Sequence, residues 1–220
     1  MESNKTYRAI RHDIVRARQQ MNHDDVHHPN EKISQITNVL PADMKNVRVL
    51  ELFAGRGNLT KKYRDYGEVV CFDKKYCKTG NSFREFHRLI ANLEIFDIVD
   101  LDPYGFPNRL FPDAYMLIED GYMFVTMPKP SVNIMNGITR THLKAYYGEH
   151  NPPLRKILDV FIDWGICHWR AVSVLDVIDC KSIWRIALRV ERVKATDYTG
   201  VRNRADESTK PILRTQLSLF

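Results

Sequence analysis

The feature that most constrains the fold of this chain is a regular alternation of two hydrophobic periods between residues 47 and 127. Short apolar runs rich in β-branched and aromatic residues, which predict buried strands, occupy residues 47–52, 68–73, 96–101 and 121–127. Segments with apolar residues at helical spacing occupy residues 58–66, 82–93 and 112–120. Alternating strands and helices with short connections predict an α/β fold. Its doubly wound, mostly parallel, Rossmann-like sheet would be covered by helices on both faces.

The end of this pattern predicts a change of strand direction. Residues 154–164 have helical spacing, and two long β-rich segments follow at residues 168–180 and 182–192. Because a single lysine separates these two segments, they must pair as an antiparallel hairpin that ends the sheet. Only residues 74–80 lie between the second strand and the next helix, so we also expect one strand–helix unit to be shortened.

A glycine-containing loop follows the first predicted strand, and residues 51–60 read Glu-Leu-Phe-Ala-Gly-Arg-Gly-Asn-Leu-Thr. A strand, Gly-x-Gly and a helix in this order let the backbone approach a ligand closely at a helix N-terminus. A dinucleotide-binding loop would need a third glycine where Thr60 stands, and the Glu51 carboxylate would repel a pyrophosphate. That carboxylate instead suits a ligand with an ammonium and a sulfonium group, such as S-adenosylmethionine.

We therefore predict an S-adenosylmethionine site at the carboxyl ends of the first strands. Asp73 ends the second strand, where an acid can accept hydrogen bonds from two ribose hydroxyls. Asp100 has two interpretations, because it could orient Asp102 or face the methionine end of the cofactor. Asn81 and Ser82 are the polar candidates near the adenine. The predicted cofactor-binding residues are Glu51, Phe53, Gly55, Gly57, Asn58, Thr60, Asp73, Asn81, Ser82 and Asp100.

The third predicted strand ends in Asp102, Pro103 and Tyr104, a set that suits chemistry on a nucleobase amine. An exocyclic amine is a poor nucleophile because its lone pair is delocalised into the ring. Asp102 could accept a hydrogen bond from the amine and stabilise the developing positive charge. The carbonyl of Pro103 could accept from the second N–H, and Tyr104 could stack on the base. These three are the predicted catalytic residues.

Residues 100–105 read Asp-Leu-Asp-Pro-Tyr-Gly, and residues 143–148 read Leu-Lys-Ala-Tyr-Tyr-Gly. The first motif resembles that of the tRNA (guanine-N2) dimethyltransferases, Asp-Leu/Ile-Asp-Pro-Phe/Tyr-Gly, and the second is similar to that family's Leu-x-x-Tyr-Gly segment. Ile-Trp-Arg-Ile at residues 183–186 occupies the place of the family's late aromatic-Phe-Arg strand. The resemblance extends from residue 47 to residue 192.

This resemblance implies a class I S-adenosylmethionine-dependent methyltransferase fold. It implies that Glu51, Asp73 and the glycines bind the cofactor, and that Asp102 and Tyr104 meet the target base. The chain departs from the family in the short stretch after Asp73, and it lacks room for the family's additional C-terminal tRNA-binding domain. The substrate is therefore less firmly implied than the chemistry.

The predicted reaction is methyl transfer to an exocyclic amino group of a nucleobase, with guanine N2 in tRNA or another RNA favoured. The alternatives are a DNA amino-methyltransferase acting on adenine N6 or cytosine N4, and a non-catalytic module that binds S-adenosylmethionine. Lys129, Arg140 and His142 follow the fourth strand on the same edge as Asp102, so they are candidate contacts to phosphates. The polar His and Asp residues at 23–28 are interpreted as a loop, and no metal site is predicted.

Composition sets the remaining expectations. A net charge of +6 is compatible with a nucleic-acid partner. The preference for RNA over DNA comes from the family resemblance. No apolar run approaches the ~20 residues of a membrane span, and the N-terminus has no signal-peptide pattern, so we expect no membrane association. The 4 cysteines form no Cys-x-x-Cys pair, which predicts reduced thiols in a cytoplasmic protein. We expect an N-terminal helical extension at 1–45, a catalytic domain at 46–193 and a tail at 194–220.

Overall fold

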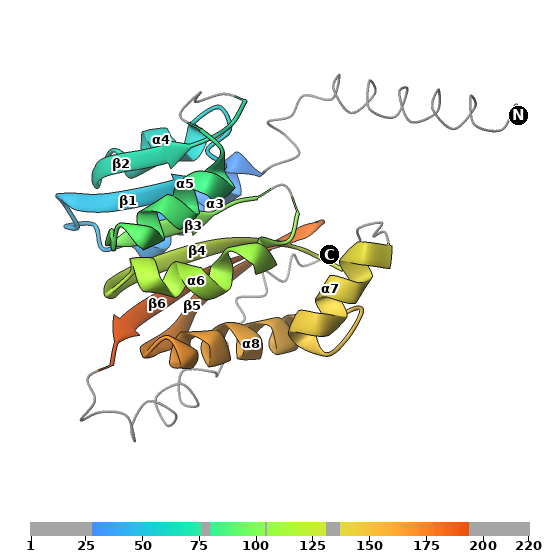
Figure 1. Cartoon of the computed structure of the whole chain (residues 1–220). Helices are drawn as coiled ribbons and strands as arrows, with labels where there is room; N and C mark the ends of the chain where they lie inside the picture. The colour runs from blue at the N-terminus through green and yellow to red at the C-terminus, as the bar shows by residue number, and fades with distance from the viewer. Residues whose placement is uncertain (1–27, 76–79, 104, 131–136, 194–220) are drawn as a thin grey trace, which may run out of the picture.

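The structure of the protein is a computed structural model, and it describes residues 28–75, 80–103, 105–130 and 137–193. These residues form a 6-stranded sheet with strand order β2-β1-β3-β4-β6-β5 (Figure 1). The strands are β1 (Val47–Leu52), β2 (Gly67–Phe72), β3 (Ile98–Leu101), β4 (Asp120–Pro128), β5 (Arg170–Cys180) and β6 (Ile183–Arg192).

Strands β2, β1, β3 and β4 are parallel, whereas β6 is antiparallel to both β4 and β5. The predicted mostly parallel sheet with a final antiparallel hairpin is therefore confirmed. The order of β1, β2 and β3 shows that the chain winds first to one side of β1 and then to the other. Among the described residues, β2 forms one edge of the sheet, which agrees with a shortened unit after it.

Helices cover both faces of the sheet (Figure 1). Their bounds are α3 (Pro29–Val39), α4 (Asn58–Tyr63), α5 (Ser82–Ala91), α6 (Phe111–Ala114), α7 (Gly137–Tyr147) and α8 (Leu154–Cys167). Helices α5, α6, α7 and α8 share a large apolar core with strand residues such as Leu50, Val99 and Val125. Helices α3 and α4 share a smaller core with Val49 and Ile98, which point to the opposite face.

The helix predicted at residues 112–120 is shorter than expected and is broken into separate turns. The chain forms a 3₁₀ turn (Pro107–Arg109), the single-turn α6 and a second 3₁₀ turn (Tyr115–Leu117). It becomes extended at Ile118, where the carbonyl of the preceding Leu117 accepts a hydrogen bond from Phe96 N–H instead of from a helical partner. Helix α7 was not predicted as a helix.

The helix predicted at residues 58–66 is shorter than expected. Helix α4 ends at Tyr63, and Gly67 is the first residue of β2. A Cβ atom at Gly67 would lie 2.0 Å from the carbonyl oxygen of Val47. Glycine is needed there because two strands approach closely, not because a helix terminates.

No helix in the described ranges is long and apolar enough to cross a membrane.

Candidate active site

The sheet topology selects the position of the site. The strand order reverses between β1 and β3, since β2 lies on the far side of β1 while β4 continues beyond β3. Ligands of open α/β sheets bind beyond the carboxyl ends of the strands at such a reversal. Glu51 and Asp100 are paired across β1 and β3 at this end, and Asp102 follows directly after β3. Alternation along the strands directs all three acids to the face covered by α3 and α4.

The loop after β1 is held in an unusual backbone conformation. Phe53, Gly55 and Gly57 have φ angles of 65°, 55° and 78°, in the left-handed region that only glycine adopts readily. The Phe53 and Ala54 N–H groups both donate to the carbonyl of Phe72 at 2.9 and 3.2 Å, which fixes the loop to the end of β2. The loop ends at Gly57, which is the N-cap residue of α4.

Asp73 lies at the end of β2, beside this loop. One carboxylate oxygen accepts from Gly55 N–H at 3.1 Å, and the other accepts from Lys75 N–H at 2.7 Å. Asp73 thus helps to hold the loop beside the end of β2.

Asn81 and Ser82 have clear local roles at the start of α5. Asn81 caps the helix, because its Oδ1 accepts from the N–H of Phe83 at 2.9 Å. The buried Ser82 hydroxyl donates to the carbonyl of Phe72 at 3.1 Å and accepts from Phe53 N–H at 3.3 Å. Ser82 therefore connects the loop after β1 to the end of β2.

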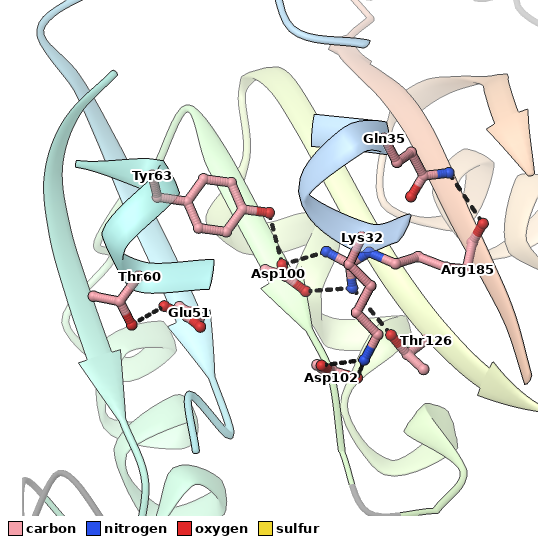
Figure 2. Close-up of polar contacts among 9 residues, drawn as sticks. All are labelled: Lys32, Gln35, Glu51, Thr60, Tyr63, Asp100, Asp102, Thr126 and Arg185. Atoms are coloured by element: carbon pink, nitrogen blue, oxygen red, sulfur yellow. Dashed lines mark hydrogen bonds and ion pairs between the residues drawn. The ribbon is translucent and has the colours of Figure 1, made fainter. Parts of the chain in front are cut away.

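Glu51 is buried beneath the start of α4. Thr60 Oγ1 donates to Glu51 Oε2 at 2.5 Å (Figure 2). Burial, with help from the charges of Asp100 and Asp102, raises the pKa of Glu51 to about 8, against the opposing effects of Thr60 and Arg185. At pH 7 this carboxyl group is therefore mostly protonated when nothing cationic lies beside it.

Asp100 is fully buried and held on both oxygens (Figure 2). Arg185, which reaches it from β6, donates from Nη1 to Oδ1 at 3.1 Å and from Nη2 to Oδ2 at 2.5 Å. Tyr63 of α4 adds a hydrogen bond from its hydroxyl to Oδ2 at 2.6 Å. Thr126 of β4 accepts from Arg185 Nη1 at 3.0 Å. Asp100 thus has no surface for a ligand and anchors a network that joins β3, β4, β6 and α4.

Asp102 is paired with a lysine from α3. Lys32 Nζ donates to Oδ1 at 2.7 Å and to Oδ2 at 2.6 Å. The Lys32 side chain is 2% exposed, whereas that of Asp102 is 21% exposed. Burial acts to raise the pKa of Asp102, but the charges of Lys32 and Arg185 outweigh it and hold the pKa below its usual range. Asp102 is therefore an ionised acceptor at neutral pH.

The charges of this group balance when Glu51 is protonated. Two carboxylates, Asp100 and Asp102, then face two cations, Lys32 and Arg185, and the remaining polar partners are hydroxyl groups. Burial opposes the charge of Arg185, yet the Asp100 carboxylate raises the pKa of Arg185 above its ordinary value. A cation that enters beside Glu51 would restore balance by displacing the Glu51 proton.

The other predicted site residues lie in different settings. The Pro103 carbonyl accepts from Gly105 N–H at 2.9 Å, and Tyr104 lies outside the described residues. Lys129 forms an ion pair with Asp179 of β5, while Arg140 and His142 are exposed on α7.

Sequence reasoning did not assign Lys32, Tyr63 or Arg185 to the site. Lys32 precedes Ile36 by one helical turn, so it lies on the buried face of α3, and a lysine within an apolar stripe was the available signal. Arg185 was noted only within the Ile-Trp-Arg-Ile segment. The segment expected to be an N-terminal extension includes α3, which packs on the sheet and reaches Asp102.

No cluster of 3 or more His, Cys, Asp or Glu side chains is arranged for a metal ion within the described ranges. Most of the polar stretch at 23–28 precedes the first described residue, His28.

Comparison with known proteins identifies the fold. No protein-family model and no curated protein sequence matches the chain. The structure is similar to that of Trm1 from Pyrococcus horikoshii in complex with S-adenosylmethionine, with a TM-score of 0.56 and 16% identity. That alignment covers 82% of this chain and 58% of the Trm1 chain, so the chain spans less than two thirds of Trm1.

The structure of a putative S-adenosylmethionine-dependent methyltransferase from Listeria monocytogenes aligns with a TM-score of 0.48 and 10% identity, over 72% of this chain and 97% of the other. The similarity to Trm1 shows that the chain has the Rossmann-like fold of S-adenosylmethionine-dependent methyltransferases.

Proposed function

We propose that this protein is an S-adenosylmethionine-dependent methyltransferase that modifies an exocyclic amino group of a nucleobase, with guanine N2 in RNA favoured. The observation that carries the proposal is the partly exposed, ionised Asp102 at the strand-order reversal, next to the left-handed loop of β1. An acid of this kind is what a weakly nucleophilic amine requires.

The residues around the β1 loop fit S-adenosylmethionine. Glu51 is a buried acid with a raised pKa, so a cationic group beside it would recover the charge that burial suppresses. Gly55 and Gly57 have a left-handed backbone and no side chains, so a ligand can approach the backbone closely at these two positions. Asp73, at the end of β2 beside the loop, is the acid proposed to accept from the ribose hydroxyls. When bound, the cofactor supplies a methyl group made electrophilic by a sulfonium.

Asp102 would act on the target amine. Its carboxylate accepts a hydrogen bond from one amine N–H, which concentrates the nitrogen lone pair and stabilises the positive charge that develops as the nitrogen gains the methyl group. The same carboxylate can then accept the amine proton. Arg185 and Lys32 support this role because both favour the ionised form of Asp102.

Three observations support RNA as the substrate. The chain carries a net charge of +6, and Arg140 and His142 are exposed on α7, which follows the carboxyl end of β4. The structurally similar Trm1 is a tRNA guanine-N2 dimethyltransferase. The motif at residues 100–105, Asp-Leu-Asp-Pro-Tyr-Gly, resembles the motif of the tRNA (guanine-N2) dimethyltransferases.

The test is incubation of the protein with isotopically labelled S-adenosylmethionine and separate pools of tRNA and duplex DNA, followed by mass spectrometry of the nucleosides. We expect label in N2-methylated guanosine from tRNA. Label only in N6-methyladenine or N4-methylcytosine of DNA would replace RNA with DNA as the substrate. Donor binding in calorimetry without transfer to either pool would favour a non-catalytic module.

A further inference from the structure

We infer that Lys32 of α3 is a positioning residue for Asp102, so that α3 belongs to the catalytic centre. This inference rests on the proposed function, in which Asp102 must be ionised and correctly oriented to accept from the target amine. The observation behind it is a buried ammonium that contacts both oxygens of that carboxylate at 2.7 and 2.6 Å (Figure 2).

The exposure of the two partners shows from which side Lys32 acts. Lys32 is 2% exposed and Asp102 is 21% exposed, so the ammonium approaches from the protein interior while part of the carboxylate remains accessible. A carboxylate has roughly four lone-pair sites, so the two contacts with Lys32 and the hydrogen bond with Thr126 still leave one for a substrate N–H. Lys32 therefore orients Asp102 without occupying its accessible side.

The surroundings explain why Asp102 needs this cation. Besides Lys32, the charged and titratable groups around it are Arg185 from β6, Asp100 two residues earlier in β3 and Glu51 from β1, and the Thr126 hydroxyl of β4 also forms a hydrogen bond with it. Arg185 is already committed to Asp100 through two hydrogen bonds. Without Lys32, burial and the neighbouring acid would favour protonation of Asp102, and a protonated carboxyl group cannot serve as a base for the amine.

The position of Lys32 is fixed by the packing of its helix. Ile36, one turn further along, is fully buried in the core that includes Phe124. Gln35 donates from Nε2 to the carbonyl of Arg185 at 3.1 Å and to Asp176 Oδ2 at 3.0 Å. These contacts attach α3 to the β5–β6 hairpin, so the register of the helix places Lys32 behind Asp102.

The first experiment compares Lys32→Met and Lys32→Arg with the wild type in single-turnover methylation at saturating donor across a range of pH. We expect Lys32→Met to lose roughly 10- to 100-fold in rate at pH 6–7 and to recover part of it as pH rises, because more Asp102 ionises. Lys32→Arg keeps a cation and should retain the wild-type pH profile more closely. Lys62→Met removes a lysine paired with Asp65 on the surface and serves as the matched control.

A second measurement does not depend on turnover. In protein labelled with ¹³C at aspartate carboxyl groups, the Asp102 signal is identified by its loss in Asp102→Asn and followed with pH. It should titrate at higher pH in Lys32→Met than in the wild type. If Lys32→Met does not fold, Lys32→Gln takes its place in both measurements.

Two results would overturn the inference. One is an unchanged titration and rate profile in the neutral variants, and the other is a variant faster than the wild type, which would show that Lys32 blocks Asp102. A wild-type protein without methylation activity would instead contradict the proposed function, and the carboxyl titration would still report whether Lys32 controls Asp102.

Discussion

Asp100 and Asp102 stand two positions apart on the same face of the sheet, yet their partners differ completely. Asp100 is enclosed by Arg185 and Tyr63 and has no exposed surface. Within the part of the chain that the structure describes, Asp102 forms an ion pair with one side chain, that of Lys32, and it keeps an accessible side. The same residue type therefore stabilises the fold at one position and is available for chemistry at the next.

Replacing Asp102 with asparagine tests its chemical role. We expect Asp102→Asn to reduce turnover by about 10²–10³-fold, because the amide cannot stabilise the positive charge that develops on the amine. Donor affinity measured by calorimetry should change little, since Asp102 is not among the residues proposed to hold the donor. Asp65→Asn, at an exposed surface position, is the control. Full activity of Asp102→Asn would refute the role given to this residue.

Glu51 gives the protein a pH dependence of defined sign. Its pKa is raised from 4.5 to about 8 in the folded protein. Between these values the folded state binds more protons than the unfolded chain, so Glu51 makes the free energy of unfolding fall as pH rises, by up to about 1.4 kcal/mol per pH unit.

Glu51→Gln removes this titration. Denaturant unfolding between pH 5 and pH 8 should therefore show that the free-energy curve of Glu51→Gln falls less steeply than that of the wild type. Two parallel curves would mean that Glu51 does not titrate in this interval.

At the scale of elements, the Asp100–Arg185 pair connects two strands that are not neighbours. Asp100 lies on β3 and Arg185 on β6, with β4 between them in the sheet. Thr126 of β4 accepts from the same guanidinium, so all three strands meet at one side chain. The antiparallel hairpin is thereby joined to the parallel part of the sheet at the active-site end.

Asp100→Asn should therefore reduce stability strongly. We expect the free energy of unfolding to fall by about 3–5 kcal/mol, because a buried arginine would lose its carboxylate partner. The control is Asp120→Asn, which removes an exposed partner of Arg189 between β4 and β6 and should cost at most about 1 kcal/mol. Denaturant unfolding measures both. Equal losses in the two variants would contradict the importance given to burial.

The elements that were predicted correctly have strong local periods. The parallel strands and the hairpin were evident because β-branched residues recur within a few positions, and the glycine loop was evident because its residues are adjacent in the sequence. Lys32 and Arg185, the cations paired with Asp102 and Asp100, were missed because they lie far from these acids in the sequence. Lys32 lies 70 residues from Asp102, and Arg185 lies 85 residues from Asp100. Local patterns carry no information about contacts over such separations, which only the packing of α3 and β6 on the sheet creates.

At the scale of the whole molecule, the positive charge predicts how RNA binding responds to salt. We expect tRNA affinity to fall by roughly 10-fold or more when salt is raised from roughly 50 to 200 mM, because bound counterions are released from the phosphates. Donor affinity should change little over the same range.

Arg140→Ala should weaken tRNA binding and reduce the slope of log affinity against log salt by about 1. Arg155→Ala, which removes another exposed arginine on α8 that pairs with Asp159, is the control. Filter-binding or fluorescence anisotropy titrations provide the data. Identical slopes for Arg140→Ala and the wild type would exclude this arginine from the RNA contact.

The arrangement around β3 also has a consequence for protein synthesis. Lys32 emerges from the ribosome early and Arg185 late, and the acids they serve lie between them in the sequence. A nascent chain that has reached β4 already contains the cofactor loop and Asp102, but Asp100 still lacks its guanidinium and the sheet lacks its last two strands. The pair between Asp100 and Arg185 can therefore form only after β6 has been synthesised, so folding of the parallel strands alone leaves Asp100 without its cation.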